Sequence, residues 1–297
     1  MTELDAWRRS LEKTLVTAAL AGTVACGQPD RDNVPGAAAA EEPAAGGAPA
    51  STARATSESP RHGEYVMYAT AGGDSVRAFV VYPERPDAAP GVIVIHEIFG
   101  LSDWIRSVAD RYAAEGFIAI APDLLWGKGP GGGGSDAYPS QDALIAAIRE
   151  LTPVEVKERL DGAYNYLRSL PSASGRVGTV GFCWGGHQSF QYAADQPGLG
   201  AAVVFYGSAP EPLDRVGGIR APVLGLYGGD DNRINAGIPA AESAMTAAGK
   251  RYQKEIYPGA GHGFLREAQA PGNVEAAAKA WPRSVEFLKA ALGAKQG

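Results

Sequence analysis

The sequence predicts an α/β protein whose mostly parallel sheet is covered by helices on both faces. From His62 onward, short apolar runs bounded by turn residues alternate with longer stretches of helical pattern. The apolar runs are nearly continuous, which is typical of strands that are buried on both faces. Because strands that alternate with helices form parallel sheets, these two observations together indicate this fold class.

The first predicted element is a β-hairpin, followed by alternating strands and helices. The stretches EYVMYAT and SVRAFVVYP are rich in β-branched and aromatic residues and flank the turn sequence Gly72-Gly73-Asp74. Five further apolar runs predict strands at residues 90–100, 117–124, 176–182, 200–207 and 221–229. Helical patterns cover residues 104–115, 153–170, 186–195, 237–248 and 274–292. Ligands of such sheets bind beyond the carboxyl ends of the strands, so reactive residues are expected there.

The composition excludes several classes of protein. The chain has 297 residues, of which 45% are hydrophobic, enough for a buried core. Its net charge of -6 and its lack of long basic runs argue against a nucleic-acid partner. The four histidines and the two cysteines, Cys26 and Cys183, show no HxxxH or CxxC spacing. The sequence therefore predicts neither a metal site nor a disulfide framework.

Residues 1–25 have the outline of an export signal. Arg8-Arg9 precede a mildly apolar stretch, as in twin-arginine signals. Thr23-Val24-Ala25-Cys26 resembles a bacterial lipobox, in which the cysteine is lipidated and becomes the mature N-terminus. The alternatives are an ordinary signal peptide cut near Ala25 and an amphipathic helix that is never cleaved. We expect an exported protein of the periplasm or cell envelope, held to a membrane only through lipid on Cys26.

Residues 26–60 contain mostly Ala, Pro, Gly, Ser and Glu, with almost nothing large to bury. Such a composition predicts a disordered tether. The remaining part, residues 61–297, is then a single folded domain, for which a monomer is favoured.

Cys183 lies where a predicted strand ends and a helix begins, within GFCWGG at residues 181–186. Gly181 and Gly185 each lie two residues away, in the G-x-nucleophile-x-G pattern of a tight turn that presents a reactive side chain above the sheet. A helix N-terminus also favours a thiolate. The alternative is a small, buried, apolar cysteine in a glycine-rich turn.

Two further predicted strand ends carry an aspartate and a histidine. Asp231 follows the apolar run at 221–229, and His262 follows KEIYPGAG. The order nucleophile, acid, histidine is that of the α/β-hydrolases, in which the carboxylate orients the histidine. Asp230 competes for this role, and Asp231 could instead be a turn or N-cap residue. The frame Gly-x-x-Asp-x-x-aliphatic favours Asp231.

Over about residues 62–293 the chain resembles the dienelactone hydrolase family. The resemblance is carried by HEIFGL, APDLL, GFCWGG, the Asp231 turn, GHGFLR and the closing EAAAKAWPRSVEFL. It implies an α/β-hydrolase fold and a triad of Cys183, His262 and Asp231 that acts on esters or lactones without a cofactor.

The resemblance also implies roles for residues around the triad. Glu97 would contact the resting thiol and help to deprotonate it when substrate arrives. The backbone N–H groups of Ile98 and Trp184 would form an oxyanion hole, which stabilises the charge that develops on the attacked carbonyl.

The substrate pocket departs from the family pattern. Members that act on anionic dienelactones hold the substrate carboxylate with two arginines, and Arg266 matches one of them. Gly127 occupies the position of the other, and the adjacent Lys128 could replace it only as a point charge. Trp126 and the glycine-rich segment 127–136, expected to be flexible, suggest a reshaped pocket rim.

These observations predict a hydrolase that cleaves a small-molecule ester or lactone through an acyl-enzyme on Cys183. Two alternatives remain open at this stage. One is a tethered binding protein that keeps the fold without turnover, because fold alone does not determine function. The other is acyl transfer to an acceptor other than water.

Overall fold

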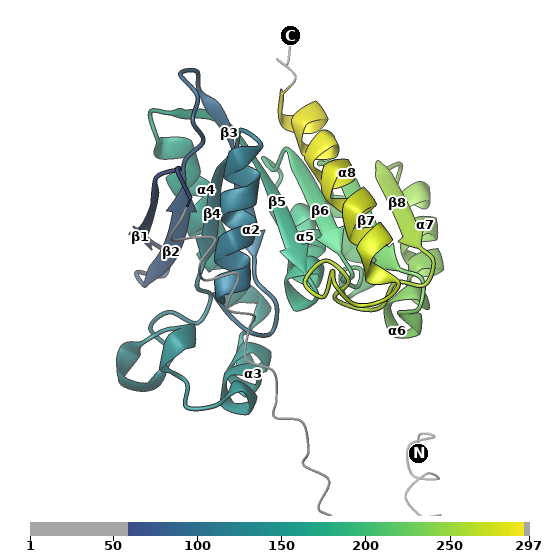
Figure 1. Ribbon diagram of the computed structural model, residues 1–297, viewed down its shortest axis with the longest axis horizontal. Coiled ribbons are helices and arrows are strands. Elements are labelled where there is room, and N and C mark those ends of the chain that lie inside the picture. Colours follow the sequence, from purple (N-terminus) through teal and green to yellow (C-terminus); the bar gives the residue numbers. More distant parts are fainter. Residues whose placement is uncertain (1–58, 294–297) are drawn as a thin grey trace, which may run out of the picture. The chain divides into compact units, whose positions relative to one another are not determined.

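The computed structural model describes residues 59–293, which contain an eight-stranded sheet in the order β1-β2-β4-β3-β5-β6-β7-β8 (Figure 1). The strands are β1 (Gly63–Ala69), β2 (Ser75–Val81), β3 (Ala89–Ile95), β4 (Ile118–Pro122), β5 (Ala173–Phe182), β6 (Ala201–Phe205), β7 (Val223–Gly228) and β8 (Tyr252–Tyr257). β1 pairs with β2 and β2 with β4 in antiparallel register, and all other pairs are parallel. The predicted hairpin and the mostly parallel sheet are confirmed.

The helices of the described residues are α2 (Asp103–Ala114), α3 (Gln141–Glu150), α4 (Pro153–Ser169), α5 (Trp184–Asp195), α6 (Asn232–Asn235), α7 (Ile238–Ala247) and α8 (Asn273–Gly293). All five predicted helices are present, with ends within two residues of the prediction. α3 was not predicted. Its N-cap, Ser140, accepts a hydrogen bond from the Ala143 N–H and is the sequence signal that could have indicated the helix.

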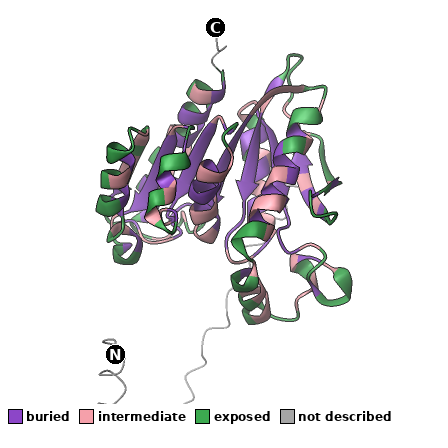
Figure 2. Cartoon of the chain, turned by 180° about the vertical axis from the view of Figure 1, so that it is seen from behind, coloured by how far each residue is buried: buried purple, intermediate pink, exposed green. Residues whose placement is uncertain are grey.

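Helices cover the sheet in two layers. α2 and α8 pack on one face and α4, α5 and α7 on the other (Figure 1). Ile93 and Ile95 of β3 point into the layer of α4, whereas Val92 and Val94 point into that of α2. Figure 2 shows the strands in the middle of the sheet buried and the outer surfaces of the helices exposed, whereas β1 at the end of the sheet is mostly exposed. Burial on both faces explains why the strands are continuously apolar.

The glycine-rich segment 127–136 is tied to the end of β4. Asp123 accepts hydrogen bonds from the Ser135 N–H at 2.7 Å and from the Ser135 hydroxyl at 2.6 Å. The same hydroxyl accepts from the Leu101 N–H at 3.1 Å. The segment expected to be flexible is therefore anchored at Ser135 to two loops at the carboxyl ends of strands.

The export signal, Cys26 and the predicted tether up to residue 58 lie outside the described residues. Ser59, near the end of the predicted tether, donates a hydrogen bond of 2.6 Å to Asp110 of α2. In residues 59–293, no helix is both long enough and apolar enough to cross a membrane.

Candidate active site

Four reactive side chains follow the carboxyl ends of four parallel strands. Glu97 lies two residues after β3, Cys183 directly after β5, Asp231 three residues after β7, and His262 in the loop after β8. The strands are parallel, so these ends lie at one edge of the sheet (Figure 1). This edge is where ligands of such sheets bind.

Cys183 occupies a strained turn between β5 and α5. Its backbone angles are φ 55° and ψ -117°, in a region that few residues other than glycine adopt. A Cβ on Gly181 would lie 1.8 Å from the Gly185 carbonyl oxygen, and one on Gly185 would lie 2.3 Å from the His96 carbonyl oxygen. The two glycines are thus required for the tight turn that raises the half-buried thiol above the sheet.

The resting thiol is neutral rather than ionised. Burial raises the pKa of Cys183, and the negative charge of Glu97 raises it further. The Trp184 N–H and the positive charges of Arg233 and Arg266 oppose this with smaller effects. The expectation of a favoured thiolate at the helix N-terminus is therefore wrong, because desolvation and the nearby carboxylate outweigh the helix end.

His262 is oriented by Asp231. Its Nδ1 lies 2.5 Å from Asp231 Oδ2, and the other carboxylate oxygen accepts from the Ile234 N–H at 3.3 Å, capping α6. Asp230 is exposed, and Asp231 is buried, so the aspartate in contact with the histidine is Asp231. His262 Nε2 is buried without a hydrogen-bond partner among residues 59–293, which leaves this nitrogen available to take a proton.

Glu97 is buried beside Arg266. Only 3% of its side chain is exposed, and burial raises its pKa to about 7, although Arg266 opposes this rise. Arg266 Nε lies 3.1 Å from Glu97 Oε2, at an angle outside that of a hydrogen bond. Glu97 can therefore exchange a proton near neutral pH. The negative charge of Glu97 raises the pKa of the Cys183 thiol.

His96 fixes the Glu97–Ile98 peptide group, whose N–H is expected to form part of the oxyanion hole, and its ring lies against that of Trp184. Its Nε2 accepts from the Leu124 N–H at 3.3 Å, so Nδ1 carries the hydrogen and donates to the Glu97 carbonyl at 2.7 Å. Its ring stacks on Trp184 with centroids 5.5 Å apart. Burial lowers the pKa of His96, which keeps the ring neutral. Among the described residues, no backbone carbonyl accepts from the Ile98 N–H.

Arg266 and Lys128, the two cations predicted to bind substrate, have different ion partners. Arg266 contacts Glu97 and Glu267 and lies over the Phe99 ring. Lys128 instead binds the carboxylate of Glu155, which caps α4. A substrate contact by Lys128 therefore stays a prediction that would require this ion pair to open.

Trp126 is held by contacts to both its ring and its backbone. Arg77 lies 5.1 Å from the centroid of its ring, and Arg159 donates to its carbonyl at 2.8 Å. These contacts fix the indole against its neighbours. Its place at the pocket rim stays a prediction.

Sequence reasoning missed two residues near the thiol. Arg233 lies two residues after Asp231, and its charge lowers the pKa of Cys183. Tyr206 follows β6 with φ 41°, its ring lies 5.1 Å from that of His262, and its hydroxyl is buried without a partner in residues 59–293. The strand predicted at residues 200–207 included Tyr206, whereas β6 ends at Phe205, so the sequence did not place Tyr206 beyond the strand end.

The groups assembled here can carry out acid–base and nucleophilic chemistry. No group of three or more His, Cys, Asp or Glu side chains within residues 59–293 could hold a metal ion. The thiol, the histidine–aspartate pair and the buried carboxylate are the reactive groups at this edge.

Comparisons with known proteins identify the family of the chain. The profile described as "Dienelactone hydrolase family" matches residues 76–292. A protein of Saccharolobus solfataricus named "Putative carboxymethylenebutenolidase" is 34% identical over 257 residues, covering 76% of this chain and 98% of the relative. One of the same name from Salmonella typhimurium is 36% identical over 237 residues, covering 76% and 86%.

Solved structures show the same similarity. The crystal structure of a "Putative Dienelactone Hydrolase" from Klebsiella pneumoniae has a TM-score of 0.69 and 29% identity, covering 76% of this chain and 98% of that one. A dienelactone hydrolase-like promiscuous phosphotriesterase from metagenomic libraries has a TM-score of 0.68 and 25% identity, covering 78% and 99%. The fold is therefore that of the α/β-hydrolases, and the chain belongs to the dienelactone hydrolase family of hydrolases, with relatives of the carboxymethylenebutenolidase type.

Proposed function

We propose that this hydrolase cleaves a carboxylate-bearing ester or lactone through a thioester on Cys183. The observation that carries the proposal is the pairing of His262 Nδ1 with Asp231 at 2.5 Å, which leaves the buried Nε2 unpartnered among the described residues. A histidine held in this way beside a strained nucleophile turn is the arrangement that acyl transfer requires.

Glu97 is the proposed base that activates the thiol. Arg266 lowers the pKa of Glu97, so a substrate carboxylate that draws Arg266 away would make Glu97 a stronger base. Glu97 then takes the proton of Cys183. Coupling thiol activation to substrate binding would keep the free thiol protected by its raised pKa.

The remaining steps use the residues around the thiol. The thiolate attacks the carbonyl carbon, and the Ile98 and Trp184 N–H groups stabilise the oxyanion. Collapse forms the thioester and releases the leaving oxygen as an alkoxide or enolate. His262 Nε2 removes a proton from water, which attacks the thioester, and passes that proton to the leaving oxygen. The released thiolate regains its own proton from Glu97.

The substrate charge is inferred from the cations beside the thiol. Arg266 and Arg233 both lower the pKa of Cys183, so both act electrostatically at the site. Arg233 has no ion pair among residues 59–293 and could supply the second positive charge that Gly127 does not. Arg266 is shared between Glu97 and Glu267, so an anionic substrate would be favoured by Arg233 and by Arg266 drawn away from these two carboxylates.

A substrate panel tests the reaction and the intermediate together. We expect turnover of p-nitrophenyl esters and small lactones, faster for those that carry a carboxylate. His262→Ala should accumulate an acyl group on the peptide that contains Cys183, detected by mass spectrometry, and Cys183→Ala should abolish turnover. Cys26→Ala is the matched control and should keep full activity.

Three outcomes would contradict the proposal. Binding without turnover would indicate a non-catalytic protein on this fold. Products joined to an added alcohol or amine, in place of free acid, would indicate acyl transfer. Full activity in Cys183→Ala would remove the thiol from the reaction.

We also propose that the protein is exported and held in the cell envelope by lipid on Cys26. The support is the twin-arginine-like and lipobox-like pattern of the N-terminal sequence.

A further inference from the structure

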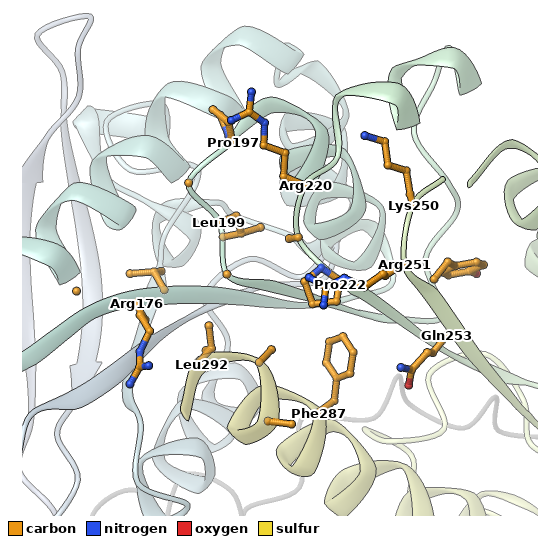
Figure 3. A pocket seen from close by; sticks show the side chains of 18 residues that line it. Arg176, Pro197, Leu199, Arg220, Pro222, Lys250, Arg251, Gln253, Phe287 and Leu292 are labelled. Atoms are coloured by element: carbon orange, nitrogen blue, oxygen red, sulfur yellow. The ribbon is translucent and has the colours of Figure 1, made fainter. Parts of the chain in front are cut away.

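An open groove of about 1070 Å³ lies at the amino ends of β5 to β8, at the opposite edge of the sheet from the active site (Figure 3). Its apolar lining includes Leu199 and Pro222 from loops before β6 and β7, and Phe287 and Leu292 from the last turns of α8. These apolar side chains contribute little exposed surface, because Leu199, Phe287 and Leu292 are buried.

The groove is basic in a chain that is acidic overall. Arg220, Lys250 and Arg251 line it, Arg176 also contributes, and no lining residue is acidic. Within residues 59–293, neither Arg220 nor Lys250 nor Arg251 forms an ion pair. The net charge of the chain is -6, so the cluster is a local feature and does not follow from the composition.

The strand order explains how the cluster forms. Arg220 precedes β7 by three residues, and Lys250 and Arg251 directly precede β8. β7 and β8 are parallel neighbours, so residues that precede each of them gather at one edge although about thirty positions separate them in the sequence. The result is a basic face made from loops, which we term the basic edge, defined by Arg220, Lys250 and Arg251.

The basic edge is suited to a plane of negative charges. Figure 3 shows Arg220 and Lys250 extending from the same side of the strands with their charged ends apart, so they do not close around one point. Arg220 and Arg251 are exposed, and no buried polar side chain without a partner lies among the lining residues. A pocket for one small anion would hold converging donors, whereas a membrane presents many phosphates over an area.

We propose that the basic edge binds the phosphate headgroups of an anionic phospholipid membrane. Charge complementarity attracts this face, and the acidic remainder of the chain is repelled, so the contact also orients the domain. The active site, at the carboxyl ends of the strands, then stays open to solvent. Lipid on Cys26 would keep the face close to such a membrane.

The cations of the basic edge could instead stabilise the fold. α5 and α7 end near this edge, and cations close to helix C-termini offset the partial negative charge there. A purely structural role would appear as lower thermal stability with unchanged membrane binding. The two roles are therefore separable by experiment.

Vesicle sedimentation tests the proposal on the full chain carrying Cys26→Ala, so that no lipid is attached. The vesicles contain phosphatidylcholine with phosphatidylglycerol, or phosphatidylcholine alone, at low and at high salt. The test variant combines Arg220→Gln, Lys250→Gln and Arg251→Gln. The matched control removes the same charge elsewhere, with Arg149→Gln, Arg168→Gln and Lys279→Gln.

We expect binding only to the anionic vesicles, weakened by salt. The test variant should bind about a hundredfold more weakly, because each of its three lost basic residues should contribute about fivefold to binding at an anionic surface. The control variant should bind less than about fivefold more weakly, which is below the contribution of one basic residue at the surface. Melting temperature and esterase activity should be unchanged in both variants.

Three results would overturn the proposal. One is equal vesicle binding by the test and control variants. Another is a lower melting temperature of the test variant with unchanged vesicle binding. The third is saturable binding of glycerol 1-phosphate, a soluble phosphate, measured by calorimetry and abolished in the test variant. This result would indicate a discrete anion site and not a membrane-binding face.

Discussion

Replacing Glu97 with Gln should make the protein more stable in mildly alkaline solution while it removes most of the activity. The Glu97 side chain is 3% exposed, and burial raises its pKa from 4.5 to about 7. Between these values the folded state holds a proton that the unfolded chain has released. The free energy of unfolding therefore falls as pH rises from 4.5 to about 7.

The size of the effect follows from the pKa difference. At about 1.4 kcal/mol for each pKa unit, ionisation of Glu97 costs the folded state about 3 kcal/mol above pH 7. Gln has nearly the same shape and no charge, so Glu97→Gln should recover up to that amount near pH 8 and almost nothing near pH 4. Arg266 is 35% exposed, so the loss of its ion partner should cost little. Because an amide cannot accept the thiol proton, kcat should fall by about a hundredfold or more.

Urea denaturation of the two proteins across this pH range, with esterase assays alongside, measures both effects. Glu155→Gln is a control of opposite sign. Hydrogen bonds from Lys128 and Thr152 lower the pKa of Glu155 to about 2, so its charge stabilises the fold above pH 4.5 and the variant should be less stable there. The reasoning is refuted if wild type and Glu97→Gln show the same change in unfolding free energy between pH 4.5 and pH 8.

Three further predictions concern substrate charge, the oxyanion hole and the anchor. Arg266→Ala should lower kcat/KM about tenfold or more for a carboxylate-bearing ester and spare its neutral isostere, tenfold being about 1.4 kcal/mol; equal losses on both esters would mean a structural role. His96→Phe should orphan the buried Glu97 carbonyl and Leu124 N–H, at about 1 to 3 kcal/mol each, and lower kcat without changing the pH profile; unchanged stability in urea would contradict this. Mass spectrometry of the mature N-terminus should find an acylated Cys26, and Cys26→Ala should be released in soluble form; an intact Met1 would exclude the lipid.

The fold was predictable because its signals are local. A strand buried on both faces reads as a continuous apolar run, and seven of the eight strands of the described residues show such a run or a hairpin pattern. The elbow around Cys183 was also predictable, since only glycine fits at positions 181 and 185. α3 was not predicted, because the glycine-rich segment that precedes it has little helical pattern.

The candidate site was predictable in its residues but not in its electrostatics. The spacing of strand ends identifies Cys183, Asp231 and His262, yet the choice between Asp230 and Asp231 depends on which carboxylate faces the histidine. The N-terminal signal and the lipid on Cys26 stay predictions, because they fall outside residues 59–293.

By itself the sequence determined the order of strands and helices along the chain, the tight turn at Cys183 and the family, because each depends on neighbouring residues or on short motifs. Only the tertiary structure decided that the thiol rests neutral, that Glu97 titrates near neutral pH and that three basic residues form one edge. The physical reason is that burial and charge interactions sum over residues far apart in the chain. Glu97 and Cys183 are separated by more than eighty positions, and their distance in space is set by the pairing of β3 with β5.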